Sequence, residues 1–262
     1  MAMSERATYA RDGFCVVRGA VPPARILALR RAVERVQASV PDLPPPLLER
    51  LTFERDLPAE NRGGATAAAV GDAIFILGDP PAFDSIFLTL LGEAGILAAV
   101  QEALGARAVV AHFMNVTIKH PGFGRAIGWH RDFPNRYACP ESSRFLRAML
   151  CLDGMTEAGG ATAFIPGSHR IGDAEARVLF AAGRAAPPAP GDAVLACCEP
   201  GDLVLIHPKV LHGGGINSAA TLRRNIVLQA GDAAAPLLSR PEQETVAGLR
   251  MTPPDIQRLT PP

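Results

Sequence analysis

The sequence predicts a mainly β domain of the α+β class, in which helices precede a β-sandwich or barrel. Two observations lead to this prediction. Short apolar or alternating runs fill the chain after residue 106, and turn segments rich in Gly and Pro (PGFG, EAGG, PGSH, EPGD and HGGGIN) separate them. Many short strands with such turns are typical of sandwiches and barrels rather than of a βαβ array. Before residue 106, the longer apolar patterns have helical spacing.

Composition narrows the class of protein further. The chain has 262 residues, of which 48% are hydrophobic and 20% charged, and its formal net charge is +0. We expect one domain, with a helical part at about 1–106, a β core at about 107–232 and a C-terminal tail at 233–262. A neutral chain without a basic block has nothing to attract nucleic acid or an anionic membrane. The sequence gives no indication of oligomeric state.

Cysteine use and the N-terminal residues indicate the compartment. The chain has five cysteines, and no pair has C-x-x-C spacing, so free thiols in a reducing cytosol are expected. The N-terminal MAMSERATYARDGF carries charges where a signal peptide needs an apolar run. No stretch reaches the roughly 18 apolar residues of a membrane span. These features predict a cytoplasmic protein that does not cross a membrane.

The first half of the chain contains one predicted strand and several helices. Residues 13–21 have the short apolar spacing of a strand, and residues 22–40 begin with Pro and continue as an amphipathic helix. The Pro-rich segment 41–46 breaks this helix. Residues 47–78 show no clear pattern. Residues 80–105 predict one or two helices that end at a glycine.

The second half contains the predicted strands of the core. They lie at 107–120, 145–153, 161–167, 192–200, 202–208 and 223–231. The Gly-rich HGGGIN is not followed by a helix, so it does not predict a phosphate-binding loop. We expect residues 181–191 and 252–262 to form a loop and a tail.

The segment GWHRDF contains a candidate pair of metal ligands. His130 and Asp132 are two residues apart, and a strand directs such residues to the same face. A third ligand would complete a face of two histidines and one carboxylate, which leaves about three coordination positions open, as in non-haem Fe(II) oxygenases. An H-x-D pair also occurs by chance in many chains. The alternative is a polar pair beside a buried aromatic residue, Trp129.

The segment from residue 199 to 229 supplies the third candidate ligand. His212 comes at the end of a strand-like run and before a Gly turn, and Arg223 begins the next predicted strand. A planar guanidinium binds a carboxylate at two points, so an arginine here would suit a cosubstrate with a distal carboxylate. His207 is expected on the same strand as His212, with its side chain on the opposite face.

Three segments together resemble the phytanoyl-CoA dioxygenase family of Fe(II)/2-oxoglutarate oxygenases. They are KHPGFGRAIGWHRDF, DGMTEAGGATAFIPGSHR and EPGDLVLIHPKVLHGGGINSAATLRRNIVLQ. They follow the family's order of W-H-x-D, then I-P-G-S-H, then P-G-D before H-x-x-x-x-N-x-S and R-R. The resemblance covers roughly residues 107–230, with a weaker match in the N-terminal D-G-F-x-V-V-R-G. Each fragment is unspecific alone, but the ordered set is specific.

The resemblance implies a double-stranded β-helix core, a jelly roll of the cupin type, with N-terminal helices packed on it. It implies Fe(II) on His130, Asp132 and His212, with 2-oxoglutarate and O2 as cosubstrates. It also implies that Arg223 holds the distal carboxylate of 2-oxoglutarate. Arg224 is the alternative, because adjacent strand residues point to opposite faces and only one can point inward.

Three further positions bear on the expected cosubstrate site. Thr117 falls where some relatives place an asparagine that contacts 2-oxoglutarate. Gly214 stands where relatives often have a serine, and Met149 lies near the position of a tryptophan in many of them. These departures predict a pocket with different walls. Lys119 either balances a carboxylate or is solvated, and the sequence does not decide between the two.

The predicted function is hydroxylation of an aliphatic C–H bond of a small molecule, with release of succinate and CO2. Asp132 argues against halogenation, because halogenating relatives lack this carboxylate. Desaturation, cyclisation and epimerisation stay open. The alternative is a cupin-like protein that binds a metal and a ligand without oxygenase turnover, although the arginine anchor favours the enzyme.

The segment 133–144, directly after the H-x-D pair, holds the candidate substrate residues. Phe133, Asn135 and Arg136 are expected to contact the substrate. Their chemistry suits a small polar molecule that carries a carboxylate. A free amino acid or a secondary-metabolite intermediate is the preferred class.

Overall fold

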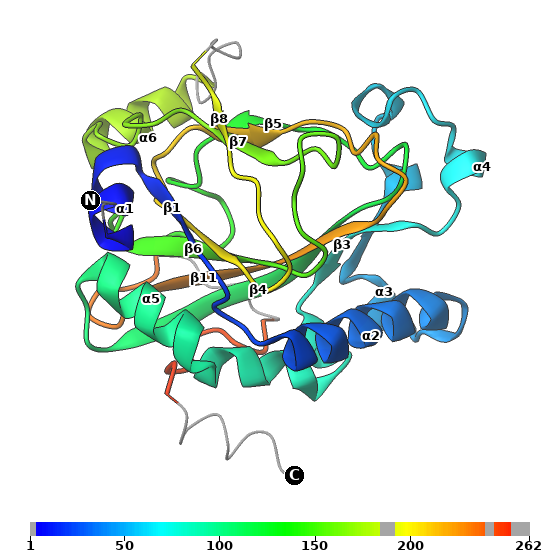
Figure 1. The fold of residues 1–262 in the computed structure, drawn as a ribbon, viewed down its shortest axis with the longest axis horizontal. Helices are drawn as coiled ribbons and strands as arrows, with labels where there is room; N and C mark the ends of the chain where they lie inside the picture. Colours follow the sequence, from blue (N-terminus) through cyan, green and yellow to red (C-terminus); the bar gives the residue numbers. More distant parts are fainter. Residues whose placement is uncertain (1–3, 184–191, 239–243, 253–262) are drawn as a thin grey trace.

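The computed structural model describes residues 4–183, 192–238 and 244–252. Two antiparallel β-sheets face each other, and helices cover the outer side of the larger sheet (Figure 1). The rings of Phe14 and Phe164, one from each sheet, stack with their centroids 4.2 Å apart. The described chain is therefore the β-sandwich with added helices that the sequence predicts.

The large sheet has seven strands and the small sheet has four. Across the large sheet the order is β1 (Phe14–Val17), β9 (Leu203–Ile206), β6 (Phe145–Cys151), β11 (Arg223–Asp232), β4 (Val109–Lys119), β3 (Ile74–Gly78) and β2 (Leu51–Phe53). Across the small sheet it is β5 (Ile127–His130), β10 (His212–Gly214), β7 (Thr162–Phe164) and β8 (Val194–Leu195).

The helices are concentrated in the first half of the chain, as the sequence predicts. The α-helices are α1 (Glu5–Asp12), α2 (Pro23–Ser39), α3 (Pro45–Leu48), α4 (Ala67–Val70), α5 (Ala94–Leu104) and α6 (Asp173–Ala181). The short 3-10 helices are η1 (Val40–Asp42), η2 (Glu54–Asp56), η3 (Ala59–Arg62), η4 (Pro80–Ala82) and η5 (Ser85–Gly92). Pro23 begins α2 because its fixed φ suits the first helical turn. Gly105 ends α5 with a positive φ of 62°.

Strand alternation divides the large sheet into an apolar outer face and a polar inner face. On β11 the buried side chains of Ile226 and Leu228 belong to the core that α2, η5 and α5 cover. Asn225, which lies between them and Arg224, points to the other face, where the small sheet lies. The outer face thus supplies most of the hydrophobic core, and the inner face supplies polar side chains to the space between the sheets.

Two helices in the core are rich in apolar residues. No single helix in the described part of the chain is long and apolar enough to cross a membrane. The consecutive helices η5 and α5, which meet at a bend of 52°, reach that length and apolarity only as a pair. Their apolar side chains, such as Phe87 and Val100, are buried in the core.

The structure corrects one prediction about the strands. His207 and His212 do not share a strand, because β9 ends at Ile206 and a turn separates it from β10, which begins at His212. The glycines of HGGGIN that were expected to form a turn therefore continue, in part, as a strand. Most of the expected loop at 181–191 and tail at 252–262 lies outside the described residues.

Candidate metal centre and adjoining cavities

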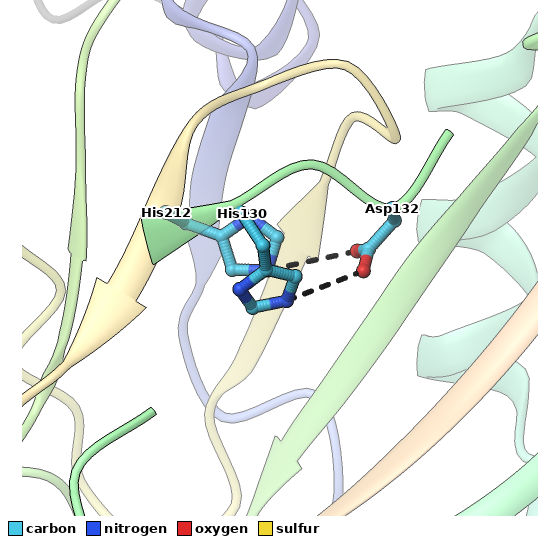
Figure 2. A group of neighbouring side chains, drawn as sticks. All are labelled: His130, Asp132 and His212. Atoms are coloured by element: carbon cyan, nitrogen blue, oxygen red, sulfur yellow. Dashed lines mark ion pairs between the residues drawn. The ribbon is translucent and has the colours of Figure 1, made fainter. Parts of the chain in front are cut away.

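Two neighbouring strands of the small sheet bring the three candidate ligands together. β5 and β10 are antiparallel, and His130 pairs directly with His212. The ligand atoms of His130, Asp132 and His212 all lie within 4.8 Å of one another. Figure 2 shows both imidazoles facing the carboxylate of Asp132: His130 Nε2 lies 3.5 Å from Oδ1, and His212 Nε2 lies 3.6 Å from Oδ2.

Backbone carbonyls orient both imidazoles. His130 Nδ1 lies 2.8 Å from the carbonyl oxygen of Gly128, and His212 Nδ1 lies 3.0 Å from that of Val210. A carbonyl only accepts, so each Nδ1 donates its proton there, and each Nε2 is the nitrogen that faces the centre. Burial, followed by repulsion from His130, lowers the pKa of His212 to about 4. This imidazole is therefore neutral near pH 7.

Asp132 completes the cluster with one oxygen to spare. The residue is 2% exposed, and its Oδ1 forms an ion pair with Arg147 Nη1 at 2.7 Å. Its Oδ2 is buried and has no hydrogen-bond partner among the described residues. Burial raises the pKa of Asp132, but the charge of Arg147 and the two histidines outweigh this and hold the pKa well below its usual range. A buried carboxylate oxygen without a partner is costly, and a cation at the centre would satisfy it.

The donor set fits iron. Two imidazole nitrogens and one carboxylate oxygen on one side of an ion form the facial arrangement that non-haem Fe(II) sites use. The hydrogen bonds at both Nδ1 atoms and the ion pair at Asp132 Oδ1 are the outer contacts that hold such ligands in place. The residues present are therefore suited to Fe(II).

An inner cavity of about 250 Å³ adjoins the cluster between the two sheets. It is lined by His130, His212, Thr117, Met149 and Arg223, among others, and none of the described residues that line it is acidic. Thr117 and Met149, which the sequence singled out on other grounds, thus both face this space.

The two adjacent arginines of β11 point in opposite directions. Arg223 is 4% exposed, lines the inner cavity and donates from Nη1 to the carbonyl oxygen of Gly160 at 2.9 Å. Burial lowers its pKa to about 10. Arg224 points outward, where its Nε lies 2.7 Å from Asp153 Oδ2 and its Nη1 lies 2.9 Å from Glu34 Oε1 on α2. Of the two, Arg223 is the one inside the cavity.

Asn225 supports the inward arginine. With its amide in the orientation that satisfies both of its atoms, its oxygen accepts from Arg223 Nη2 at 2.8 Å and its nitrogen donates to the backbone oxygen of Arg224 at 2.9 Å. The side chain is fully buried. The guanidinium of Arg223 is therefore held in one orientation by neutral acceptors.

Lys119 is a second buried basic side chain in the inner cavity. Its side chain is fully buried at the end of β4, and Nζ donates to the carbonyl oxygens of Gly160, at 3.2 Å, and Gly215. Burial, followed by the charge of Arg223, lowers its pKa to about 6. A Cβ at Gly214 would lie 3.2 Å from Nζ, so the glycine leaves room for this side chain. The sequence signal for an inward Lys119 is its spacing of two residues from Thr117.

Arg147 is the residue that the sequence interpretation missed. It lies on β6 with its side chain directed inward, and its guanidinium carbon lies 5.3 Å from the ring centre of Phe113 and 5.8 Å from that of Tyr137. Its Nη2 also donates to the Tyr137 hydroxyl. Alternation in FLRAMLC, which places positions 147 and 149 on one face, was the available signal.

The three predicted substrate residues have different surroundings. Phe133 is 1% exposed, packs beside Phe145 and lines neither the inner cavity nor the outer cavity that His130 also borders. Asn135 uses its Oδ1 to close a turn, accepting from Ala138 N at 2.8 Å. Asn135 and Arg136 both line an outer cavity of about 490 Å³. The geometry thus gives Phe133 a place in the core and leaves the other two beside open space.

Comparison with known families agrees with this site. Residues 9–225 match the family described as phytanoyl-CoA dioxygenase (PhyH). The chain belongs to this family. The predicted resemblance is confirmed, and membership supports the predicted enzyme class, a non-haem iron dioxygenase.

Two curated relatives are fungal dioxygenases. "Dioxygenase cdmD" of Talaromyces verruculosus is 32% identical over 108 residues, which cover 40% of this chain and 32% of the relative. "Dioxygenase trt7" of Aspergillus terreus is 35% identical over 81 residues, which cover 31% of this chain and 25% of the relative. The matched segments therefore span a third or less of these relatives.

Solved structures with the same fold cover nearly the whole chain. EctD from S. alaskensis, solved with bound Fe, has a TM-score of 0.70 at 20% identity and covers 95% of this chain and 83% of its own. AviO1 from Streptomyces viridochromogenes has a TM-score of 0.67 at 24% identity, with coverages of 90% and 99%. The epimerase SnoN has a TM-score of 0.62 at 19% identity, with coverages of 94% and 88%. These matches confirm the predicted jelly-roll fold.

Proposed function

We propose that this protein is an Fe(II)/2-oxoglutarate-dependent dioxygenase that hydroxylates an aliphatic C–H bond of a small molecule, with release of succinate and CO2. One observation carries the proposal. Three ligand atoms converge beside a cavity that contains two buried basic side chains, Lys119 and Arg223, and no acidic lining residue among those described. A site of this kind suits a metal ion together with a dianionic cosubstrate.

The metal would be held by His130 Nε2, His212 Nε2 and Asp132 Oδ2. When bound there, Fe(II) supplies the activation of O2, with the 2-oxo acid as the source of two electrons. The chain presents Nε2 of both imidazoles to the metal, because both Nδ1 atoms donate to backbone carbonyls. Arg147 occupies Asp132 Oδ1 and so leaves Oδ2 as the oxygen available to the ion.

The far carboxylate of 2-oxoglutarate would be held by Arg223 and Lys119. Both side chains are buried, and the partners described for them are carbonyl and amide oxygens rather than carboxylates. A buried guanidinium without an anion is unfavourable, and a carboxylate favours the protonated form of the Lys119 amine, so an incoming carboxylate improves the environment of both groups. Thr117, two residues before Lys119, lines the same cavity and is the third residue proposed to contact the cosubstrate.

The walls of the inner cavity would exclude water from the reacting groups. Met149, Ile206 and Val227 bring apolar side chains to its lining. In such surroundings each electrostatic contact is stronger than in water, and reactive species are protected from side reactions. The chain thus provides binding, orientation and exclusion of water, while the bound groups provide the oxidation.

The names of structural relatives support the cofactors. EctD has been solved with 2-oxoglutarate and 5-hydroxyectoine, and SnoN with Fe3+, alpha ketoglutarate and nogalamycin RO. These two proteins accept small molecules, which supports a small-molecule substrate here. SnoN is named an epimerase, so the same fold serves more than one outcome, and hydroxylation is the outcome proposed for this chain.

The test is succinate formation from 2-oxoglutarate, with Fe(II) and ascorbate, across a panel of free amino acids and small metabolites. We expect at least one compound to stimulate succinate formation and to gain an oxygen atom detectable by mass spectrometry. The Asp132→Ala variant is the matched control and should lose the stimulation. Absence of both Fe(II) binding and succinate formation would contradict the proposal. Binding of Fe(II) and 2-oxoglutarate without any turnover would favour a cupin-like binding protein instead.

A further inference from the structure

The outer cavity reaches the same metal centre as the inner one. It has a volume of about 490 Å³ and shares three lining residues, His130, Tyr137 and Arg147, with the inner cavity. One of the three, His130, is a proposed metal ligand, so a molecule in the outer cavity lies against the centre. Tyr137 is 48% exposed, which shows that solvent reaches this region.

Positive charge dominates the two cavities. Among the described residues that line them, Asp132 is the one acidic side chain. The basic ones are the arginines Arg131, Arg136, Arg147 and Arg223, together with Lys119, whose amine becomes charged when a carboxylate binds beside it. The two charges of a divalent metal and the two of 2-oxoglutarate cancel each other, so loading the inner site leaves the surplus in place. Such a surplus favours a further anion.

Most of these cations already have partners. Arg131 Nη1 donates to the carbonyl oxygens of Ser168, at 2.7 Å, and of Lys209. Arg131 also interacts with Glu175 of α6. Arg147 contacts Asp132 and Tyr137, as described above.

Arg136 is the cation of the outer cavity that has donors to spare. Its side chain is exposed, and its described contact is with the ring of Phe180 on α6, 5.7 Å from the guanidinium carbon. It forms no ion pair with any residue in the described ranges. A guanidinium has five N–H donors in a planar fork and binds carboxylate or phosphate at two points.

We propose that the outer cavity is the substrate site, and that it selects a small anionic molecule whose carboxylate or phosphate is held by Arg136. The rings of Tyr137 and Phe180 then lie beside the rest of the molecule, and His130 marks the side on which its reacting carbon faces the metal centre. This inference rests on the proposed function. It names the substrate by charge, which the proposed reaction alone does not.

The test measures anion binding directly and needs no knowledge of the natural substrate. Protein loaded with Mn(II) and saturating 2-oxoglutarate, without O2, is titrated by calorimetry with benzoate, phenyl phosphate and benzamide. Benzamide is the neutral counterpart of benzoate and has nearly the same shape. The variant is Arg136→Gln. Its matched control is Arg31→Gln, an exposed position on α2, which lies on the opposite side of the molecule from α6 (Figure 1).

We expect at least one of the two anions to bind about tenfold or more tightly than benzamide, since a hydrogen-bonded charge contributes on this scale. Arg136→Gln should remove that advantage, and Arg31→Gln should preserve it. The tighter of benzoate and phenyl phosphate identifies the favoured anionic group. Equal binding of benzamide and both anions, absence of anion binding, or an unchanged advantage in Arg136→Gln would overturn the proposal.

Loading with Mn(II) and 2-oxoglutarate is measured first in all three proteins. Failure of the wild-type protein to load contradicts the proposed function itself. Normal loading followed by loss of anion selectivity in Arg136→Gln supports the substrate site. The two ideas are therefore tested separately.

Discussion

Buried arginines on the two faces of the large sheet have different kinds of partner. On the outer face Arg224 is paired with two carboxylates, from Asp153 and Glu34. On the inner face its neighbour Arg223 is equally buried, but its described partners are the neutral oxygens of Gly160 and Asn225. The comparison teaches that burial alone does not assign a role to a charge. A paired arginine stabilises the fold, whereas an unpaired one beside a cavity is available to a ligand.

The strongest test of the inner face is removal of the metal-binding charge. Asp132→Asn keeps the size of the side chain but replaces the carboxylate by a neutral amide. We expect the Kd for Fe(II) to rise about a hundredfold or more, since loss of even an outer partner of a metal ligand costs 10–100-fold. Anaerobic Fe(II) titration measures this. Thermal unfolding of the same variant shows whether it is folded, and unchanged Fe(II) affinity in a folded variant would exclude Asp132 as a ligand.

On the outer face, Arg224→Met should lower stability. The change removes the bidentate partner of Asp153, which is 12% exposed and keeps one ion pair, with Arg30 Nε at 3.0 Å. We expect the free energy of unfolding to fall by about 2 kcal/mol, less than for a fully buried pair because the second partner, Glu34, is exposed. Urea denaturation measures the change. A variant as stable as wild type would mean that the pairs on this face add little to stability.

On the inner face, Arg223→Met should instead weaken 2-oxoglutarate binding, by about tenfold. Its effect on unfolding should be much smaller than that of Arg224→Met, because no carboxylate loses a partner. Calorimetric titration of 2-oxoglutarate into Mn(II)-loaded protein measures the affinity. If Arg223→Met and Arg224→Met lower 2-oxoglutarate affinity and the free energy of unfolding to the same extent, the two faces do not differ in this way.

The smallest expected effect is an uptake of protons by Lys119. Its pKa of about 6 means that the amine is mostly neutral at pH 7.5 before a ligand binds. A carboxylate beside Nζ raises this pKa, so binding of 2-oxoglutarate should take up close to one proton, and affinity should fall as the pH rises above 6. Calorimetry in buffers of different ionisation enthalpy counts the protons. Lys119→Met should abolish the uptake, and zero uptake in wild type would place the ligand carboxylate elsewhere.

Part of this site could be predicted from the sequence because its signals are local. H-x-D spacing on a strand places His130 and Asp132 together, and the order of the motifs points to His212. Alternation also predicts that Arg223 and Arg224 face opposite sides. It does not say which one faces inward, because the partners of Arg224 on the outer face include Glu34 on α2, which is far away in the sequence.

The rest of the site depends on contacts between distant segments. Arg147 lies in a run that is otherwise apolar. Its partner Asp132 lies in the connection that leads from β5 of the small sheet to β6 of the large sheet. Phe133 directly follows that ligand, but its ring joins Phe145 and Ala176 in a separate core. The strand β10 has the sequence HGG, which carries no strand propensity, so only its pairing with β5 and β7 identifies it.

The direct pairing of His130 with His212 makes the metal centre a check on the register of the small sheet. A slip of one residue between β5 and β10 would turn one imidazole to the opposite face. Any ion that needs both nitrogens therefore binds one alignment of the two strands and rejects its neighbours. The free energy of metal binding would then stabilise that alignment alone. The metal would therefore favour the native register of β5 and β10 over the shifted ones.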